Sequence, residues 1–385
     1  MGALFRNRKF REAMLQALLV SVVAALLIAM IVNARQSLDA QGMTSGFAFL
    51  ERSTGWDFSF STLEYSISDT YQRTLIIGLL NTLLLGVTGI FFATLIGVAI
   101  GLIRNSGNYL FSLLGTVYVE IFRNVPLILQ AVFWYSIIIH LPRPKQAYSI
   151  GDAVYLSGRG FYFPVVNLSG SSVVTAVVLL IALWFVLRFA RQRFTRLRHF
   201  VTFKQLAWLL VLSLIGLLIY TGHQTGTPWL DKPALKGLNF RGGFRVPPEL
   251  SALIIAIALY GGAYIGEVVR AGLMSVPKGQ IEAARVLGIK SRHIFTRVRL
   301  PLAIRAVLPS LTNQYVQLMK ATTIGLAIGF SDFFMIVSTS INQSGQTLEL
   351  IAILMGGFLL INLSIAFVMN TINRQIALKG YEVKS

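Results

Sequence analysis

Long apolar stretches separated by shorter polar segments dominate the chain. An apolar run of about 20 residues is long enough to cross a bilayer as a helix. By this criterion we expect about eight spanning helices, at residues 13–32, 75–103, 110–141, 172–187, 206–220, 250–269, 303–328 and 350–368. The pattern therefore predicts an all-α membrane protein.

Two of these stretches have features of their own. The run at 110–141 contains Arg123, Asn124 and Pro126, and proline cannot continue the hydrogen-bond ladder of a helix. We expect a kinked or broken helix there, with its polar break covered by protein rather than by lipid. The run at 13–32 is longer than the about 7–15 apolar residues of a cleaved signal peptide, so we interpret it as a retained span, with cleavage near Asn33 as the alternative.

Composition agrees with lipid as the solvent. Of 385 residues, 55% are hydrophobic and 13% are charged, whereas soluble domains have about 25% charged residues. The formal net charge of +19 is also found in nucleic-acid-binding proteins, but these basic residues cluster between apolar runs, so we expect no nucleic-acid partner. Cysteine is absent and the four histidines lack ligand spacing, so we expect no metal site.

The basic residues also predict the orientation. If the N-terminus is cytoplasmic, the segments on that side hold more than twice as many Lys and Arg residues as those opposite. The positive-inside rule then places both termini in the cytoplasm. The segments 35–74 and 142–170, which are rich in Gly, Ser and aromatic residues, would lie outside.

The segment 277–301 lies between two expected spans, on the cytoplasmic side, and reads PKGQIEAARVLGIKSRHIFTRVRLP. Good helix formers follow Glu282, Gly288 can end that helix in the left-handed conformation, and Ser291 can cap a second helix. We expect a compact helix–turn–helix. Such a rigid element can dock on another subunit and pass its motion to both adjoining spans.

This segment resembles the EAA loop of bacterial ATP-binding-cassette (ABC) import permeases. The family pattern is E-A-A, three residues, G, nine residues, an aliphatic residue, any residue and L-P. The chain matches it at Glu282, Ala283, Ala284, Gly288, Val298, Leu300 and Pro301, with valine where isoleucine is usual. The resemblance implies that Glu282, Ala283, Ala284 and Gly288 belong to a coupling helix that docks on an ATPase subunit.

Further motifs are similar to the polar-amino-acid uptake family of these permeases. They are GLLNTL at 78–83, EIFRNVPL at 120–127, GEVVRAG at 266–272 and NQY at 313–315. The resemblance covers 75–141 and 250–368 and implies the five-span type I permease core. The family often has Lys-Asp-Thr-Ser where this chain has KATT at 320–323, so single-substrate relatives are a poor guide to its substrate.

The remaining parts look like the broad-specificity general L-amino-acid permeases, through FYFP at 161–164 and GLNFRGG at 237–243. The resemblance implies that the chain lies in the bacterial inner membrane and has three partners. They are a second homologous permease as a heterodimer partner, a cytoplasmic ABC ATPase dimer and a periplasmic amino-acid-binding protein. The chain has no G-x-x-x-x-G-K-[ST] phosphate loop. ATP and Mg would therefore bind to the ATPase, and this chain is expected to be no enzyme and to hold no cofactor.

These inferences predict the domain organisation. It comprises an N-terminal anchor (1–34), a periplasmic segment (35–74), the first part of the permease core (75–141), an insertion with two spans and periplasmic loops (142–249), the second part of the core with the EAA loop (250–373) and a cytoplasmic tail (374–385). Within the spans, the G-x-x-x-G motifs at 97–101 and 325–329 predict close helix packing.

Charged and polar residues inside spans are costly and are candidates for the substrate pathway. Glu120 and Arg123 lie three residues apart; they can neutralise one another or bind the ammonium and carboxylate groups of an amino acid. The pair Glu267 and Arg270 has the same spacing near a cytoplasmic end, where we expect a structural ion pair.

A second group of candidates comes from the span at 303–328. Asn313, Gln317 and Lys320 share one face of a helix, and Thr322 follows. They can contact a zwitterionic amino acid, hydrogen-bond neighbouring helices, or form a polar lining with no specific site.

We therefore interpret the chain as an ABC importer permease that moves L-amino acids. An ATP-independent channel or secondary transporter would share the spans and the polar core, but it would not need the docking surface at 282–301. A membrane-integral enzyme would require a nucleophile–base pair or a metal constellation, which the sequence does not show.

Overall fold

The computed structural model describes residues 8–40, 46–151, 153–167, 197–223 and 228–376, with four residue pairs between 175 and 187. Two compact units are present, Met1–Tyr135 with Ala252–Ser385, and Ser136–Ser251. The expected span at 172–187 lies largely outside the described residues.

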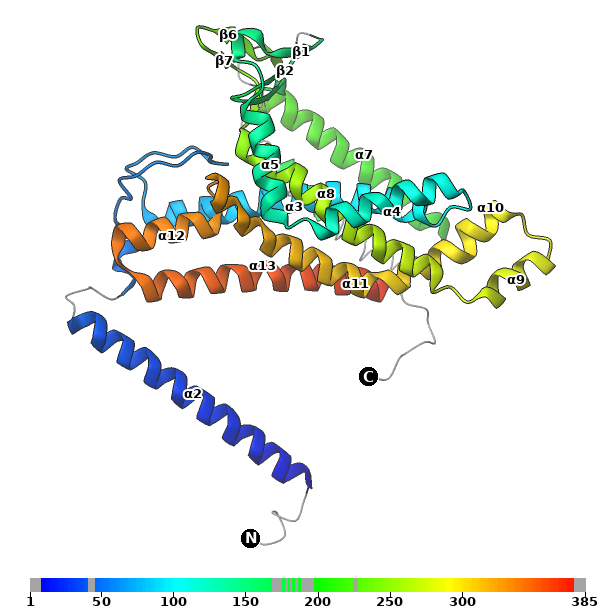
Figure 1. The fold of residues 1–385 in the computed structure, drawn as a ribbon, viewed down its shortest axis with the longest axis horizontal. Helices are drawn as coiled ribbons and strands as arrows, with labels where there is room; N and C mark the ends of the chain where they lie inside the picture. The colour runs from blue at the N-terminus through cyan, green and yellow to red at the C-terminus, as the bar shows by residue number, and fades with distance from the viewer. Residues whose placement is uncertain are drawn as a thin grey trace. The chain divides into compact units, whose positions relative to one another are not determined.

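The larger unit is built from helices (Figure 1). They are α2 (Arg8–Ala40), α3 (Tyr71–Arg104), α4 (Tyr109–Asn124), α5 (Leu127–Ile139), α8 (Pro248–Met274), α9 (Lys278–Val286), α10 (Ser291–Ile294), α11 (Leu300–Ala321), α12 (Phe333–Ser344) and α13 (Thr347–Ile376). Two short 3₁₀ helices, η1 (Phe47–Glu51) and η4 (Thr322–Ile328), and one π-helical turn, η3 (Phe295–Arg299), join them. α12 packs against α3 and α13, and α13 also packs against α11.

Among the described residues, α3, α8 and α13 are long and apolar enough to cross a bilayer, and two bent helix pairs bring the number to five if each pair is one span. The pair α4 and α5 bends by 100°, and the segment Ser291–Ile328 bends by 52° relative to α12. The expected spans at 13–32 and 206–220 correspond to shorter apolar stretches, Met14–Met30 and Gln205–Tyr220. The part of the chain that the structure describes thus supports three of the eight expected spans, or five if each bent pair is one span.

The break predicted around Pro126 is present between α4 and α5. The buried side chain of Gln130 bridges it: its Nε2 donates to the carbonyl oxygens of Phe122 (3.0 Å) and Val125 (2.9 Å). These carbonyls lie at the end of α4, where no following helical turn supplies an N–H donor. The residues of the break itself, 124–126, are exposed.

Glycines allow α3 and α8 to approach closely. A Cβ atom at Gly97 would lie 2.6 Å from Cβ of Ile265, and one at Gly101 would lie 2.6 Å from Cγ1 of Val269. The predicted packing role of this G-x-x-x-G motif is confirmed. In the second motif only Gly325 packs closely, since a Cβ there would lie 3.1 Å from Cδ1 of Leu253 on α8. Gly329 instead has a φ of 78° and ends η4 as a left-handed cap.

The smaller unit contains β-structure that the hydrophobic pattern did not predict, beside helix α7 (Leu197–Gly222) and the 3₁₀ turn η2 (Pro144–Gln146). Four antiparallel strands form one sheet in the order β1 (Tyr148–Ile150), β2 (Val154–Ser157), β3 (Gly160–Phe163) and β8 (Phe244–Val246). Two further ladders pair β4 (Val165–Val166) with β5 (Leu230–Asp231), and β6 (Ala234–Lys236) with β7 (Asn239–Arg241).

The two sequence motifs of the insertion meet in this unit. Tyr162, from FYFP, donates its hydroxyl proton to Oδ1 of Asn239 (2.9 Å), from GLNFRGG. The rings of Tyr162 and Tyr155 lie 4.9 Å and 4.4 Å from that of Phe240. Because Tyr162 and Phe240 are buried, these residues form a small aromatic core that aligns the short strands.

Candidate functional site

The segment with the EAA pattern forms a helix–turn–helix, as predicted. Gly288 separates α9 from α10 and has a φ of 70°. Its N–H donates to the carbonyl of Arg285 (2.9 Å), and that of Ile289 donates to the carbonyl of Ala284 (3.2 Å). These two bonds define a Schellman motif, in which glycine at the left-handed position ends the helix.

The start of the second helix differs from the prediction. Ser291 is the first residue of α10 rather than its cap, and Lys290 precedes it without a side-chain capping bond. The π-helical turn η3 then leads into α11, which has Pro301 in its first turn. Because proline lacks an N–H and its ring crowds the carbonyl four residues earlier, a widened turn relieves the clash.

The segment is fixed to two spans by apolar contacts. Ile281 of α9 and Phe295 of η3 pack against a cluster at the end of α8 and the start of α11. The buried members of this cluster are Leu273, Val276 and Ala303. These contacts join α9 to the end of α8 and to the start of α11.

Polar contacts reinforce this junction. The guanidinium group of Arg299 donates to the carbonyl oxygen of Leu273 through Nε and Nη2 (both 3.2 Å) and to Oδ1 of Asn105 through Nη2 (3.1 Å). One side chain thus links the start of α11 to the end of α8 and to the α3–α4 loop.

An ion-pair cluster joins α8 to the end of α3. Glu267 accepts a hydrogen bond from Nη2 of Arg270 at 2.5 Å, so the predicted structural pair is confirmed. Glu267 also pairs with Arg104 of α3. The carboxylate therefore links α8 to α3 and also neutralises the charge of Arg270 on its own helix.

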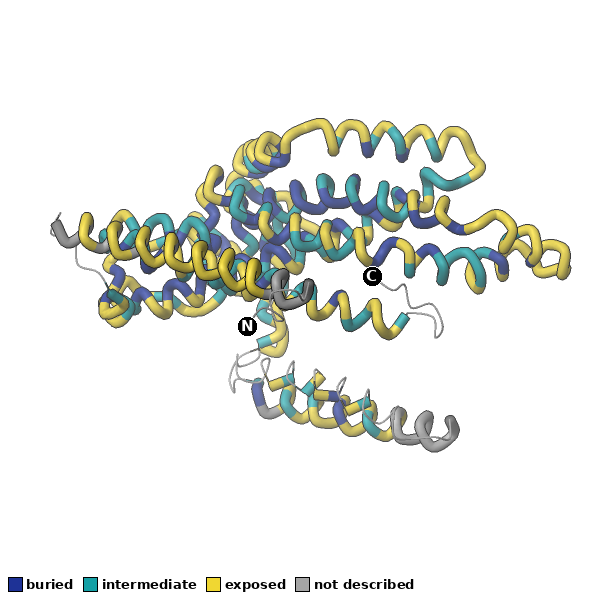
Figure 2. Tube along the Cα trace, turned by 90° about the horizontal axis from the view of Figure 1, so that it is seen from below, coloured by how far each residue is buried: buried dark blue, intermediate teal, exposed yellow. Residues whose placement is uncertain are grey.

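The tip of the segment is uncovered (Figure 2). Glu282 and Ala283 are exposed, whereas Ala284 is buried. Val286 and Leu287 are 88% and 77% exposed. Adjacent apolar side chains with so much exposed surface are typical of a contact surface for another protein.

A cavity of about 570 Å³ lies beside the α4–α5 break. It is lined by Pro126, Leu127, Ile128, Tyr260, Tyr264, Gln314, Gln317, Leu318, Ala321 and Ile324. The guanidinium carbon of Arg123 lies 5.0 Å from the ring centroid of Tyr264, in a cation–π arrangement. Apolar walls, two phenols, two amides and a neighbouring cation suit a small zwitterionic molecule.

The predicted helix face on α11 is only partly turned to this cavity. Gln317 lines the cavity, and Arg123 reaches its edge through Tyr264. Asn313 and Lys320 are exposed and lie outside the lining.

The remaining candidates have other contacts. Glu120 does not pair with Arg123; it accepts a hydrogen bond from Nδ2 of Asn124 (3.2 Å). Thr322 is fully buried and donates to the carbonyl oxygen of Met319 (2.8 Å), so it stabilises the end of α11 and does not line the cavity.

The sequence interpretation missed three cavity residues, Tyr260, Tyr264 and Gln314. The tyrosines are four residues apart and therefore on one face of α8, separated by glycines and an alanine. That spacing of phenols within an otherwise apolar span was the available signal.

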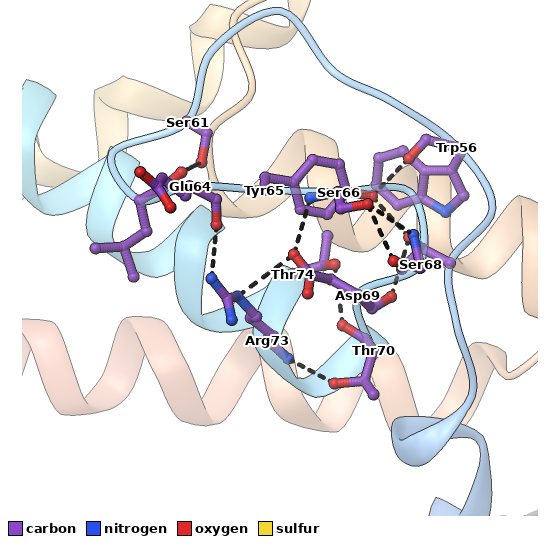
Figure 3. A network of polar contacts seen from close by, with 12 residues as sticks. Trp56, Ser61, Glu64, Tyr65, Ser66, Ser68, Asp69, Thr70, Arg73 and Thr74 are labelled. Carbon is purple, nitrogen blue, oxygen red and sulfur yellow. Dashed lines mark hydrogen bonds and ion pairs between the residues drawn. The ribbon is translucent and has the colours of Figure 1, made fainter.

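A second polar site involves residues 46–70, which we call the strap. The strap folds back on itself: Thr54 N donates to the carbonyl of Asp69 (3.0 Å), and the hydroxyl of Tyr65 donates to the carbonyl of Trp56 (2.5 Å). Arg73, in the first turn of α3, donates to the carbonyl of Glu64 (2.7 Å) and pairs with Asp69 (3.4 Å), as Figure 3 shows. The strap is thus an ordered part of the larger unit.

Asn81 joins the strap to the bent helix pair. Its Nδ2 donates to the carbonyl oxygens of Phe60 (3.0 Å) and Ser331 (2.7 Å), and its Oδ1 accepts from the N–H of Thr62 (3.1 Å). Asn81 is fully buried. The sequence motif GLLNTL contained this residue but gave no indication of its partners.

Known proteins resemble this chain over most of its length. A family model described as "Binding-protein-dependent transport system inner membrane component" matches residues 93–378. The chain is 40% identical to the putative amino-acid ABC transporter permease protein YhdX of Escherichia coli, over 97% of this chain and 96% of the relative. It is 36% identical to the general L-amino acid transport system permease protein AapQ of Rhizobium johnstonii, over 96% and 93%. A solved amino acid ABC transporter with histidines aligns with a TM-score of 0.48 and 19% identity, over 79% of this chain and 95% of that one.

Proposed function

Because this chain belongs to the family of inner-membrane components of binding-protein-dependent transport systems, we propose that it is the permease subunit of an ABC importer for a broad range of L-amino acids. The full-length relatives are named as amino-acid permeases. The single observation that carries the proposal is the uncovered helix α9, which is fixed to two spans but has an exposed outer face among the residues that the structure describes.

The coupling step follows from that geometry. Glu282, Ala283 and the exposed Leu287 face an ABC ATPase dimer, which binds ATP and Mg in the cytoplasm. Ala284 and Gly288 set the shape of the helix end. Because α9 is packed on α8 and α11, closure of the ATPase moves both spans together. ATP binding drives transport only if the ATPase binds the two permease conformations with different affinities.

The substrate pathway runs past the cavity beside the α4–α5 break. The cation of Arg123 attracts the carboxylate of an amino acid, and the amides of Gln314 and Gln317 offer neutral donors and acceptors. The phenol rings present apolar surface to different side chains, which fits broad specificity. Glu120, Asn313 and Lys320 have exposed side chains, so they can line the pathway only where the assembled transporter surrounds them.

A second permease chain completes the membrane part. Residues 124–126, in a bent span, are exposed, and lipid cannot satisfy the polar backbone of such a break. A homologous permease covering this surface would exclude lipid and enclose the pathway, and we propose a heterodimer. We place the chain in the bacterial inner membrane with both termini on the cytoplasmic side. The strap then faces the periplasm, where an amino-acid-binding protein can dock.

The test is ATP-driven uptake by the complex reconstituted in vesicles with its ATPase and binding protein. Gly288→Pro should abolish uptake while membrane insertion persists, because proline cannot adopt a φ near 70° and lacks the N–H that bonds Arg285. Glu282→Lys should also abolish uptake by reversing a charge at the contact. Gly279→Pro is the matched control, since the first turn of α9 tolerates proline.

Normal uptake by both variants would contradict the coupling role. Uptake that continues without any ATPase would identify an ATP-independent channel or secondary transporter instead, the alternative that has no need of the coupling segment.

A further inference from the structure

The bent helix pair changes direction through a short, unusual stretch. η4 is a 3₁₀ helix, Gly329 follows with a φ of 78°, and Asp332 caps α12 by accepting from the N–H of Met335 (2.8 Å). A 3₁₀ stretch within a longer helical run is a common hinge geometry. It lies between α11, which leads from the coupling segment, and α12.

Both sides of this hinge pack on α3 and α13, but the α12 side also has buried polar bonds to the hinge backbone. On the α12 side, Phe330, Ser331 and Asp332 are fully buried, and the N–H of Phe333 donates to Oγ1 of Thr82 on α3 (2.9 Å). The apolar face of α12 also packs on the strap and α3. The buried members of that cluster are Phe49, Tyr71, Leu75, Phe333, Ile336, Val337 and Leu350.

The strap supplies hydrogen bonds that the irregular backbone lacks. Oγ of Ser59 donates to the carbonyl of Gly329 (2.8 Å) and lies 3.0 Å from Oγ of Ser331. The ring of Phe60 stacks on that of Phe330, with centroids 5.8 Å apart. Together with Asn81, these contacts satisfy the carbonyls of Gly329 and Ser331, which helix geometry leaves free.

We propose that Asn81 and Ser59 are positioning residues for transport, which hold residues 329–331 and the start of α12 against α3 and the strap throughout the cycle. α11 then turns about η4 and Gly329 when the coupling segment moves, while α12 stays fixed. A buried polar network with its bonds made resists rearrangement, whereas a 3₁₀ turn capped by glycine can deform. This inference rests on the proposed function, because the motion is the ATP-driven one.

We call the contacts of Ser59 and Asn81 with residues 329–331 the clamp. The chain contains no cysteine, so an engineered disulfide can replace the clamp without competing thiols. Ser59→Cys with Ser331→Cys places two thiols where the hydroxyl oxygens are 3.0 Å apart. In the reconstituted complex, the oxidised pair should keep at least half of ATP-driven uptake. Asn81→Ala alone should reduce uptake per ATP hydrolysed at least fivefold, with basal ATPase activity within twofold of the parent.

The decisive arm combines the two changes. With Asn81→Ala, oxidation of the cysteine pair should restore coupling to within twofold of the parent, and reductant should remove it again. The matched control is Ser53→Cys with Thr70→Cys, an antiparallel pair within the strap beside the start of α3, which should not restore coupling. If Asn81→Ala does not assemble, Asn81→Leu, which loses both donors and keeps about the same size without burying a charge, takes its place.

Two results would overturn the inference. Loss of uptake on oxidation of the Ser59–Ser331 cysteine pair with Asn81 intact would mean that the contact must open during transport. Failure of the disulfide to restore coupling would mean that Asn81 does not act through this clamp. Both are distinct from failure of the proposed function, which would appear as absent ATP-driven uptake by the unmodified chain.

Discussion

The two ends of α11 are built in opposite ways. At its start, α9 and the turn at Gly288 project from the helices, and Val286 and Leu287 are largely exposed. At its far end, Asn81, Ser331 and Asp332 are completely buried, and polar bonds from the strap and α3 hold the backbone. The first end exposes apolar side chains, while at the second end the carbonyl oxygens of Gly329 and Ser331 find hydrogen-bond donors within the chain.

This contrast separates partner binding from internal support. A helix end that exposes apolar side chains gains free energy only when another molecule covers it. A buried amide with all its bonds made contributes to the fold itself, and its loss leaves carbonyls unsatisfied. Substitutions at the two ends should therefore change different measurements.

The largest effect is expected at the buried end. Asn81→Ala should lower the free energy of unfolding by roughly 2–4 kcal/mol, because it leaves the carbonyls of Phe60 and Ser331 without their donor. Thermal unfolding of the purified complex measures it. Asn124→Ala, which removes an exposed amide bonded to Glu120, should change stability by less than about 0.5 kcal/mol. Equal shifts would contradict the stabilising role assigned to Asn81 at the buried end.

An intermediate effect is expected at the exposed end. Leu287→Asp should weaken association with the ATPase at least tenfold, or about 1.4 kcal/mol, because it places a charge in the apolar contact. Thermal stability of the permease should not change. Leu63→Asp is the control, since Leu63 is also exposed but belongs to the strap. ATPase affinity unchanged by Leu287→Asp would contradict the assignment of this surface.

The smallest effect is expected at the cavity beside the α4–α5 break. Gln317→Ala should raise the KM of uptake roughly three- to tenfold, the range expected for one hydrogen bond worth about 0.5–1.5 kcal/mol. Neither stability nor ATPase affinity should change, because Gln317 lines the cavity and belongs neither to the coupling segment nor to the buried network at residues 329–332. Asn313→Ala, on the same helix but outside the lining, should leave KM unchanged. A rise in KM for Asn313→Ala alone would move the substrate pathway to the exposed face.

The coupling segment shows how far local pattern reaches. Glu282 to Gly288 was predictable as a helix with a left-handed end, because these preferences act within a few residues. The kink at Pro126 was predictable for the same reason. Ser291 failed as a cap because the helix began one residue earlier, and the π-turn before Pro301 had no distinct sequence signal.

The sequence by itself determined the apolar spans, the broken helix, the coupling segment and, through its motifs, the transport family. Each depends on chain-local chemistry: length of apolar runs, proline, glycine and residue spacing. Only the tertiary structure decided that the guanidinium of Arg123 lies over the ring of Tyr264 and that Thr322 is a structural residue. It also decided that Asn81 donates to the carbonyl oxygens of Phe60 and Ser331. Those pairings join residues up to 250 positions apart in the chain, and no local preference encodes which distant group completes a hydrogen bond.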